Sequence, residues 1–269
     1  MSNHIAAKFL GFIYSPIPKQ KFAELVSQLE DSLRVKLPRY ETPAVNNIVV
    51  NVTDNNVATQ QNTAGKELHM VDANGMFGVK IGDAGVAISA AEYVSYDDLV
   101  AFAKWIIENV VTILNVTHFS RLSLRNINLF KEVEGSPNTF RDIRNGTYWG
   151  RQEFPTLDDD FSCTGAATRH EYFSNDYLTH LQLLSGVVMN NQSYIPQEEW
   201  NIWRLRGEIP SAGKVQLLVD ISGTSFQAPM NEPEKQNNVT EYNWDLVENE
   251  LNSLHAIVNK VYFDITKED

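Results

Sequence analysis

The chain is short of the features that mark secreted and membrane proteins. It has 269 residues and one cysteine, Cys163, so it cannot form an intramolecular disulfide. It has no run of about 18 consecutive apolar residues, the length that a helix needs to cross a membrane. The first ten residues lack the basic segment followed by an apolar segment that characterises a secretory signal. These absences predict a cytoplasmic protein with no membrane partner.

Positive charge is also scarce. The chain has 22 Lys and Arg against 34 Asp and Glu, a formal net charge of −12. This excess repels a phosphate backbone at long range, which makes nucleic acid an unexpected partner. It suits a partner protein of basic character, because complementary charge speeds association and adds specificity. The net charge is also compatible with a homo-oligomer, in which copies of the chain associate with one another.

Motifs that carry catalysis or hold a cofactor are missing as well. The chain has no P-loop, no GxGxxG loop and no GxSxG nucleophile motif. No two histidines have the HExxH spacing, and one cysteine cannot build a cysteine-rich zinc site. The three aspartates at 158–160 do not supply the roughly six to eight spaced oxygen ligands of a calcium site. We therefore predict no catalytic residue, no metal and no cofactor.

Apolar spacing predicts both strands and helices in the first half. Residues 8–14 are apolar and aromatic, as is typical of a strand, and helical spacing follows over 22–34. Asn74-Gly75 predicts a hairpin, because both residues tolerate positive φ. Residues 54–65 are rich in Asn, Gln and Thr, which favours a loop. Further strands are expected at 46–53, 66–71, 76–81, 85–89 and 119–130, and a long helix at 96–115.

The second half predicts another set of strands and a terminal helix. Gly and Pro residues scattered through 132–170 indicate an irregular segment. Strands are expected at 172–188, 199–209 and 214–221. A helix from about Thr240 carries an a/d seam made of Trp244, Val247, Leu251, Leu254, Val258 and Val261. This seam either packs on the second sheet or forms a coiled-coil or partner-helix interface.

Together these elements predict an α+β fold with two lobes, each a mostly antiparallel sheet packed by a long amphipathic helix. The expected domains are an N-terminal α+β lobe at 1–131, a connecting segment at 132–170, and a C-terminal antiparallel lobe with its terminal helix at 171–269. A chain of this length can bury a sizeable core, so it needs no disulfide to hold it together.

The strand that follows the long helix carries a family resemblance. Residues 121–128 read Arg-Leu-Ser-Leu-Arg-Asn-Ile-Asn. This is similar to the Arg-x-x-Leu-Arg-aromatic-x-Asn strand of a sporadically distributed family of uncharacterised prokaryotic proteins, with Asn126 in place of the aromatic. Leu-Leu-Val-Asp-Ile at 217–221 and Leu-Asn-Ser-Leu-His at 251–255 also resemble that family. The resemblance implies no established activity, but its patchy distribution is similar to that of defence-associated and toxin–antitoxin genes.

The same strand supplies the candidate ligand residues. Arg121, Ser123 and Arg125 share parity, so their side chains point to one face of a sheet. Two arginines on one face could hold a phosphate or a carboxylate. They could equally pair with acids on a neighbouring strand or at a helix end. Asn128 is the third candidate, with a backbone group or turn as its alternative partner.

Tryptophans supply the candidate partner-binding residues, because buried aromatics dominate the energetics of protein interfaces. They are Trp149, Trp200 and Trp203. Trp149 lies among arginines, a pattern that also occurs in single-strand nucleic-acid binding, but the surrounding acids cancel the positive charge and favour a loop held by ion pairs.

Three functional interpretations follow. The leading one is a non-catalytic protein-binding module, such as an antitoxin-like or immunity-like protein or a phage-defence accessory protein. The alternative is a sensor or binder of a small anionic ligand or nucleotide through the Arg121/Arg125 strand face. The third is an enzyme whose carboxylates would be among Asp72, Asp220 and Asp264, although no spacing selects them.

Overall fold

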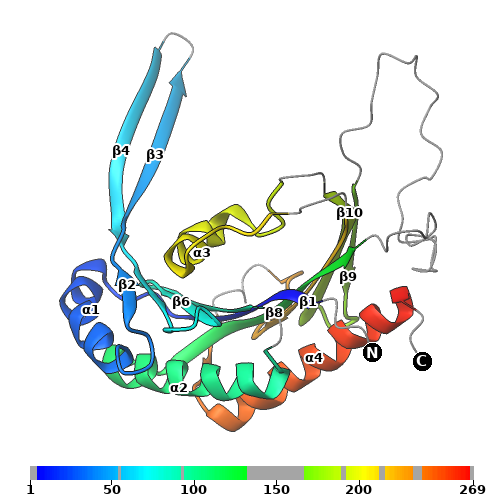
Figure 1. The fold of residues 1–269 in the computed structure, drawn as a ribbon. Helices are drawn as coiled ribbons and strands as arrows, with labels where there is room; N and C mark the ends of the chain where they lie inside the picture. Colours follow the sequence, from blue (N-terminus) through cyan, green and yellow to red (C-terminus); the bar gives the residue numbers. More distant parts are fainter. Residues whose placement is uncertain are drawn as a thin grey trace.

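The computed structural model describes residues 5–53, 56–91, 94–131, 167–188, 192–211, 216–232 and 238–266 (Figure 1). The helices of this part are α1 (Lys19–Leu33), α2 (Tyr96–Leu114), the 3-10 helix η2 (Gln197–Glu199), α3 (Trp200–Arg206) and α4 (Trp244–Thr266). The strands are β1 (Ile5–Tyr14), β2 (Arg39–Glu41), β3 (Ala44–Thr53), β4 (Asn56–Lys66), β5 (Leu68–Val71), β6 (Phe77–Ile81), β7 (Gly85–Ala91), β8 (His118–Lys131), β9 (Ala167–Phe173), β10 (Thr179–Val188), β11 (Gln216–Phe226) and β12 (Thr240–Glu241).

All strands except β3 and β4 belong to one sheet of ten strands. Its order is β2–β5–β6–β7–β1–β8–β11–β10–β9, with β12 added to β8, and every pairing is antiparallel. The α+β class with a mostly antiparallel sheet is therefore confirmed. β8 pairs with β1 on one side and β11 on the other, so strands from the two halves of the chain meet there.

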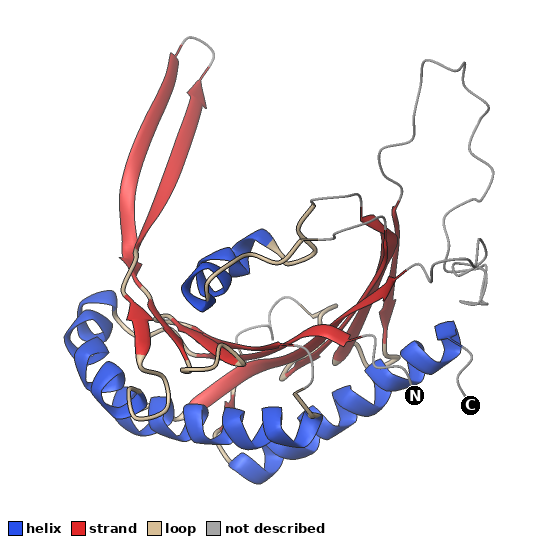
Figure 2. Cartoon of the chain, viewed as in Figure 1, coloured by secondary structure: helices blue, strands red, loops and turns tan. Residues whose placement is uncertain are grey.

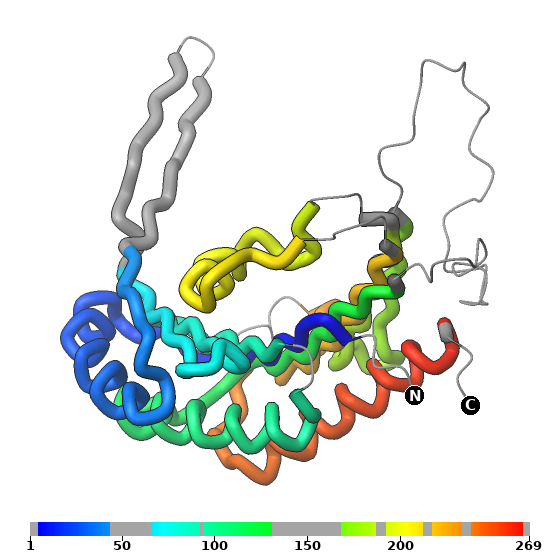
Figure 3. Tube along the Cα trace, in the orientation of Figure 1, coloured from blue at the N-terminus to red at the C-terminus, as the bar shows by residue number. Residues whose placement is uncertain are grey.

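This meeting at β8 corrects the expectation of a separate sheet in each half. In the Cα trace the blue β1 and the green β8 run side by side through the middle of the sheet (Figure 3). An alternating apolar pattern identifies a strand and its buried face, but it does not identify the strand beside it. The expected connecting segment, 132–170, lies outside the described residues up to 166, and its last residues begin β9.

The sheet is strongly curved, and different helices cover its two faces (Figure 2). α1, α2 and α4 lie along the convex face, whereas α3 lies on the concave face. Leu10, Phe12 and Tyr14 alternate along β1 and are at most 1% exposed. They share the largest hydrophobic core with apolar residues of all three convex-side helices. Burial of this apolar surface is the main stabilising contribution to the fold.

α2 begins and ends where its local sequence predicts. The hydroxyl of Ser95 accepts a hydrogen bond from the backbone N–H of Asp98 at 3.0 Å, which satisfies one of the free donors of the first turn. Asn115 follows the last turn in the left-handed conformation, with φ of 53°. The prediction of a helix over 96–115 is confirmed.

α4 packs its apolar seam against the sheet of its own chain. Val247, Leu251 and Val258 are completely buried, and the helix lies on β8 and β11. The seam therefore packs on the one large sheet, at strands from both halves of the chain, and not on a separate second sheet. The expected cap is wrong, because Thr240 lies in β12 and the side chain of Asn243 accepts the hydrogen bond from the Asp245 N–H at 2.8 Å. No helix within the described ranges is both long and apolar enough to cross a membrane.

Two other expectations about local structure are wrong. The expected loop at 54–65 contains β4, which pairs with β3 along its length despite its many amide side chains. The expected strand at 199–209 is η2 followed by α3. Apolar residues at odd positions, Trp203, Leu205 and Ile209, resemble the alternation of a strand. In the structure, one side of a helix is buried through Ile202 and Trp203. The helix ends before Gly207, where φ is 138°.

The expected strand at 172–188 divides into two strands. β9 ends at Phe173 and β10 starts at Thr179, with Tyr177 in the left-handed conformation between them. The side chain of Asp176 accepts a hydrogen bond from the Leu178 N–H at 3.0 Å within this turn. Asn and Asp residues favour such turns, so the signal was present at 174–176.

Candidate binding pocket on the concave face

α3 is held tightly on the concave face of the sheet. A Cβ atom added at Gly78 of β6 would lie 2.4 Å from Cγ2 of Ile202, so helix and strand approach as closely as glycine allows. Arg206 donates from Nη2 to the backbone oxygen of Ser89 at 2.9 Å and to its hydroxyl at 2.8 Å. Burial lowers the pKa of Arg206 to about 10. These contacts make α3 and η2 a fixed wall above the sheet.

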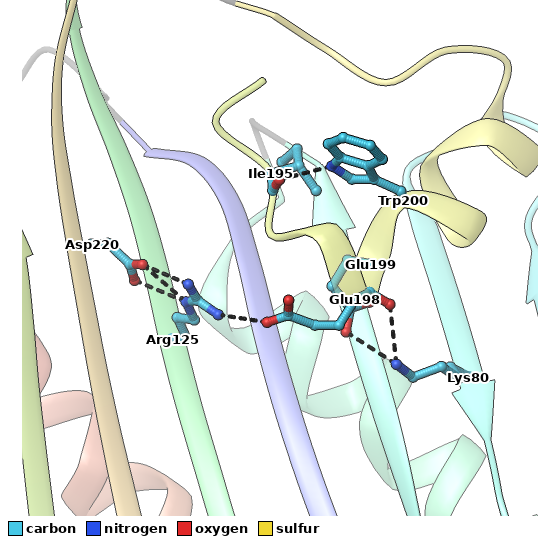
Figure 4. A network of polar contacts seen from close by, with 7 residues as sticks. All are labelled: Lys80, Arg125, Ile195, Glu198, Glu199, Trp200 and Asp220. Carbon is cyan, nitrogen blue, oxygen red and sulfur yellow. Dashed lines mark hydrogen bonds and ion pairs between the residues drawn. The ribbon is translucent and has the colours of Figure 1, made fainter. Parts of the chain in front are cut away.

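The two candidate tryptophans of α3 build this wall. Trp203 is 8% exposed and packs among Ala7 and Ile127 of the sheet. The indole N–H of Trp200 donates to the backbone oxygen of Ile195 at 3.0 Å (Figure 4). Both therefore stabilise the packing of α3. The third candidate, Trp149, lies outside the described residues.

Arg125 is paired with acids from two different elements. Its Nε lies 2.9 Å from Oδ1 of Asp220 on β11, and its Nη2 lies 2.6 Å from Oδ2. Its Nη1 lies 3.5 Å from Oε1 of Glu198 in η2 (Figure 4). Burial acts to lower the pKa of Arg125, but hydrogen bonds and charge from Asp220, followed by Glu198, leave it raised. This pairing is the structural alternative that the sequence left open for Arg125.

A second ion pair ties η2 to β6. The ammonium of Lys80 lies 3.6 Å from Oε1 of Glu199 and donates to the backbone oxygen of Glu198 at 3.2 Å (Figure 4). Glu199 is only 8% exposed. Its charge is therefore matched by that of Lys80 inside the fold.

An open pocket of about 230 Å³ lies between this wall and the sheet. Its lining includes Gly11, Arg121, Ser123 and Arg125 from β1 and β8. Ser222 and Thr224 of β11 and Glu199 of η2 complete its polar lining. The structure thus brings Arg121 and Arg125 to one pocket, as their shared parity predicted.

Arg121 differs from Arg125 in its surroundings. Its side chain is exposed, and within the described residues no carboxylate lies at ion-pair distance from it. The hydroxyls of Ser123, Ser222 and Thr224 likewise make no hydrogen bond to any described residue. The pocket therefore contains a free cation and free hydroxyl groups.

Asn128 lies away from this pocket. It has even parity on β8, so it belongs to the opposite face from Arg121 and Arg125. It is 1% exposed, and its Nδ2 donates to the backbone oxygen of Val219 at 3.0 Å. Asn128 thus makes the backbone contact that was its alternative role.

The acids considered for catalysis do not gather at one place. Asp72 accepts a hydrogen bond from the Phe77 N–H at 3.0 Å and so closes the β5–β6 turn. Asp220 pairs with Arg125, and Asp264 lies near the end of α4. Among the residues that the structure describes, no group of His, Cys, Asp and Glu could hold a metal ion.

A second cleft, of about 380 Å³, lies between α2 and α4. Two pairs of its polar groups satisfy one another. The hydroxyl of Tyr96 donates to Asn252 at 3.1 Å, and the indole N–H of Trp244 donates to Glu248 at 2.9 Å. The ammonium of Lys104 lies 5.5 Å from the Trp244 ring centroid. This cleft offers a ligand fewer free groups than the concave pocket does.

No family model and no curated protein matches the chain. The case for a function therefore depends on the chain itself. Four residues of the pocket and its wall were not predicted from the sequence: Glu198, Glu199, Ser222 and Thr224. The sequence held a signal for the last two, because Ser222 and Thr224 are two residues apart and so point to the same face of a strand.

Proposed function

We propose that this chain is a non-catalytic module that binds a partner protein, in the manner of an antitoxin, an immunity protein or a phage-defence accessory protein. The observation that carries this proposal is the arm formed by β3 and β4. These two long strands pair with each other and with no other described strand. The arm rises from the sheet on the same side as α3 (Figure 1).

An isolated arm of this kind is a natural site for a partner. A two-stranded hairpin is marginally stable in water by itself, because it has no second layer on which to bury side chains. Each of its strands also leaves one row of backbone N–H and C=O groups without a strand beside it. A strand or surface of another protein would satisfy both needs by adding to the arm.

The sequence of the arm lacks the usual protection of exposed edges. Native proteins place Pro, Lys or other charged residues on such strands to prevent pairing with other chains. Between residues 44 and 65 the chain has no Lys and no Pro, and its single charge is Asp54. The arm also carries the β-branched run Ile48-Val49-Val50. The edges of the arm therefore lack the charges and prolines that would oppose the addition of another strand.

The remaining parts of the proposal come from charge and from family resemblance. A net charge of −12 favours a basic partner through faster and more specific association. We propose the cytoplasm as the compartment, which suits a chain with a single cysteine. We also propose that the chain is related to the sporadically distributed prokaryotic family. Its connection with defence or toxin–antitoxin genes is part of the same proposal.

The test is to shorten the arm without touching the sheet. Residues 47–62 are replaced by Asn-Gly, so that Asn46 and Thr63, which are register partners, flank a two-residue hairpin turn. Tagged wild-type and shortened chains are purified from the native host and analysed by mass spectrometry. We expect a stoichiometric protein with the wild type and its loss from the shortened chain, while the melting temperature stays unchanged.

A matched control separates the arm from general surface hydrophobicity. Val35 is 86% exposed and lies outside the arm, so Val35→Lys should keep the partner. A partner that the shortened chain retains would contradict the role of the arm. Light scattering gives the remaining outcome: a wild-type dimer that becomes a monomer on shortening would show that the arm binds a second copy instead.

A further inference from the structure

We propose that the concave pocket binds a small molecule that carries a carboxylate, with Arg121 as the anchor. This site is separate from the β3–β4 arm and does not depend on what the arm binds. Three properties of the pocket carry the inference: the charge that it leaves unmatched, the hydroxyl groups beside that charge, and the shape of its floor.

The unmatched charge is that of Arg121. Three charged side chains line the pocket: Arg121, Arg125 and Glu199. Arg125 is paired with Asp220, and Glu199 is paired with Lys80. Arg121 alone of the three has no oppositely charged partner among the described residues. A guanidinium in this situation is suited to a bidentate contact with a carboxylate.

The hydroxyls lie beside the place where such a carboxylate would sit. Ser123 follows Arg121 by two residues on β8 and therefore shares its face. Thr224 of β11 is the direct cross-strand partner of Ser123. Their hydroxyls make no hydrogen bond to any described residue, so both can donate to one oxyanion.

The floor is low because small residues form one row across the sheet. Ala87 of β7 pairs with Gly11 of β1, Gly11 pairs with Ser123, and Ser123 pairs with Thr224. A Cβ atom at Gly11 would lie 2.4 Å from the Ser123 hydroxyl oxygen, so glycine keeps this row open. A ligand can therefore approach the backbone of the sheet between the wall of η2 and Arg121.

The surrounding acids select a carboxylate over a phosphate. Glu198, Glu199 and Asp220 all lie beside the Arg125 end of the pocket. These three carboxylates outnumber the two cations that pair with them, Arg125 and Lys80, and the net negative charge repels a dianionic phosphate more strongly than a monoanionic carboxylate. A monoanionic carboxylate needs only one guanidinium, and that of Arg121 has no carboxylate partner among the residues that the structure describes. A preference for a carboxylate distinguishes this pocket from a nucleotide-binding site.

The experiment is a titration of the full chain with N-acetylglycine, followed through the Nε–H resonance of Arg121 in NMR spectra. N-acetylglycinamide, which has a neutral amide in place of the carboxylate, is the matched probe. We expect a saturable shift with N-acetylglycine and none with N-acetylglycinamide. Thr224→Val keeps the shape of the side chain but removes the hydroxyl, and it should weaken binding about tenfold.

Control variants make the outcome decisive. Arg121→Gln should abolish N-acetylglycine binding in a ligand-observed titration. Arg204→Gln should not change it, because the Arg204 guanidinium lies over the Trp200 ring and outside the pocket lining. An absent shift, an equal shift with N-acetylglycinamide, or tighter binding of inorganic phosphate than of N-acetylglycine would each overturn the proposal. The arm-shortened chain should bind N-acetylglycine as the wild type does.

Discussion

Arg125 and Asp220 face each other across β8 and β11, with the guanidinium donating to both carboxylate oxygens. The two residues lie 95 positions apart in the chain. Their contact therefore joins the N-terminal and C-terminal halves at the strand pair where the sheet continues from one half to the other. Asp220 is almost buried, with 7% of its side chain exposed, so water cannot replace the missing partner if either residue is removed.

Loss of this pair should destabilise the fold. Asp220→Asn leaves the partly buried Arg125 with the exposed Glu198 as its one charged partner among the described residues, so we expect a loss of about 2–3 kcal/mol in the free energy of unfolding. Urea denaturation measures it. Arg169→Gln is the control, because its ion pair with Glu171 is exposed and should contribute less than about 1 kcal/mol. Equal losses in the two variants would contradict the structural role of Asp220.

Acid should destabilise the fold through His255. Burial lowers the pKa of His255 from its ordinary value of 6.5, and the charge of Lys8 lowers it further, while Asp97 opposes them. The folded chain therefore binds fewer protons than the unfolded chain just below pH 6.5. Stability is then lost as the pH falls from 6.5 through the lower folded-state pKa.

The measurement compares unfolding free energies of the wild type and His255→Gln on either side of this interval. The ring of His255 stacks on Tyr96 with centroids 3.6 Å apart, so the variant also loses a contact that does not depend on pH. We expect the advantage of the wild type over the variant to shrink toward acid pH. A difference that stays constant would contradict the prediction, and His118→Gln provides the control for other histidines.

Close packing of α3 makes Gly78 sensitive to a single added carbon. Gly78→Ala places a Cβ atom 2.4 Å from Ile202 Cγ2, which forces α3 away from the sheet. We expect a loss of about 1–3 kcal/mol in unfolding free energy, with a change in tryptophan fluorescence from Trp200 and Trp203. At Gly82 the nearest atom to such a Cβ, Glu67 Cγ, is 4.0 Å away, so Gly82→Ala should have little effect. Similar losses at both positions would contradict the packing argument.

The elements that sequence predicted well are those whose signals are local. α2 has an apolar face, a Ser95 cap and a left-handed Asn115, all within the helix and its immediate neighbours. The Asn74-Gly75 turn works in the same way, with Gly75 at φ of 72°. Where the decisive contact was distant, the prediction failed. α3 is a helix that buries Ile202 and Trp203 against strands from far along the chain. At β4 the prediction failed for another reason, because pairing with the adjacent strand β3 outweighs a composition typical of loops.

The same distinction between local signals and distant contacts applies to the candidate site. Strand parity alone determined that Arg121 and Arg125 share a face, because side chains alternate along any strand, whereas the expectation that Asn128 joins them was wrong. Only the tertiary structure decided that Arg125 pairs with carboxylates, whereas Arg121 meets none in the part of the chain that the structure describes. That outcome depends on Asp220 and Glu198, which the sheet order and the position of η2 bring to Arg125 from far along the chain. Local periodicity sets where a side chain points, whereas strand pairing sets what it meets.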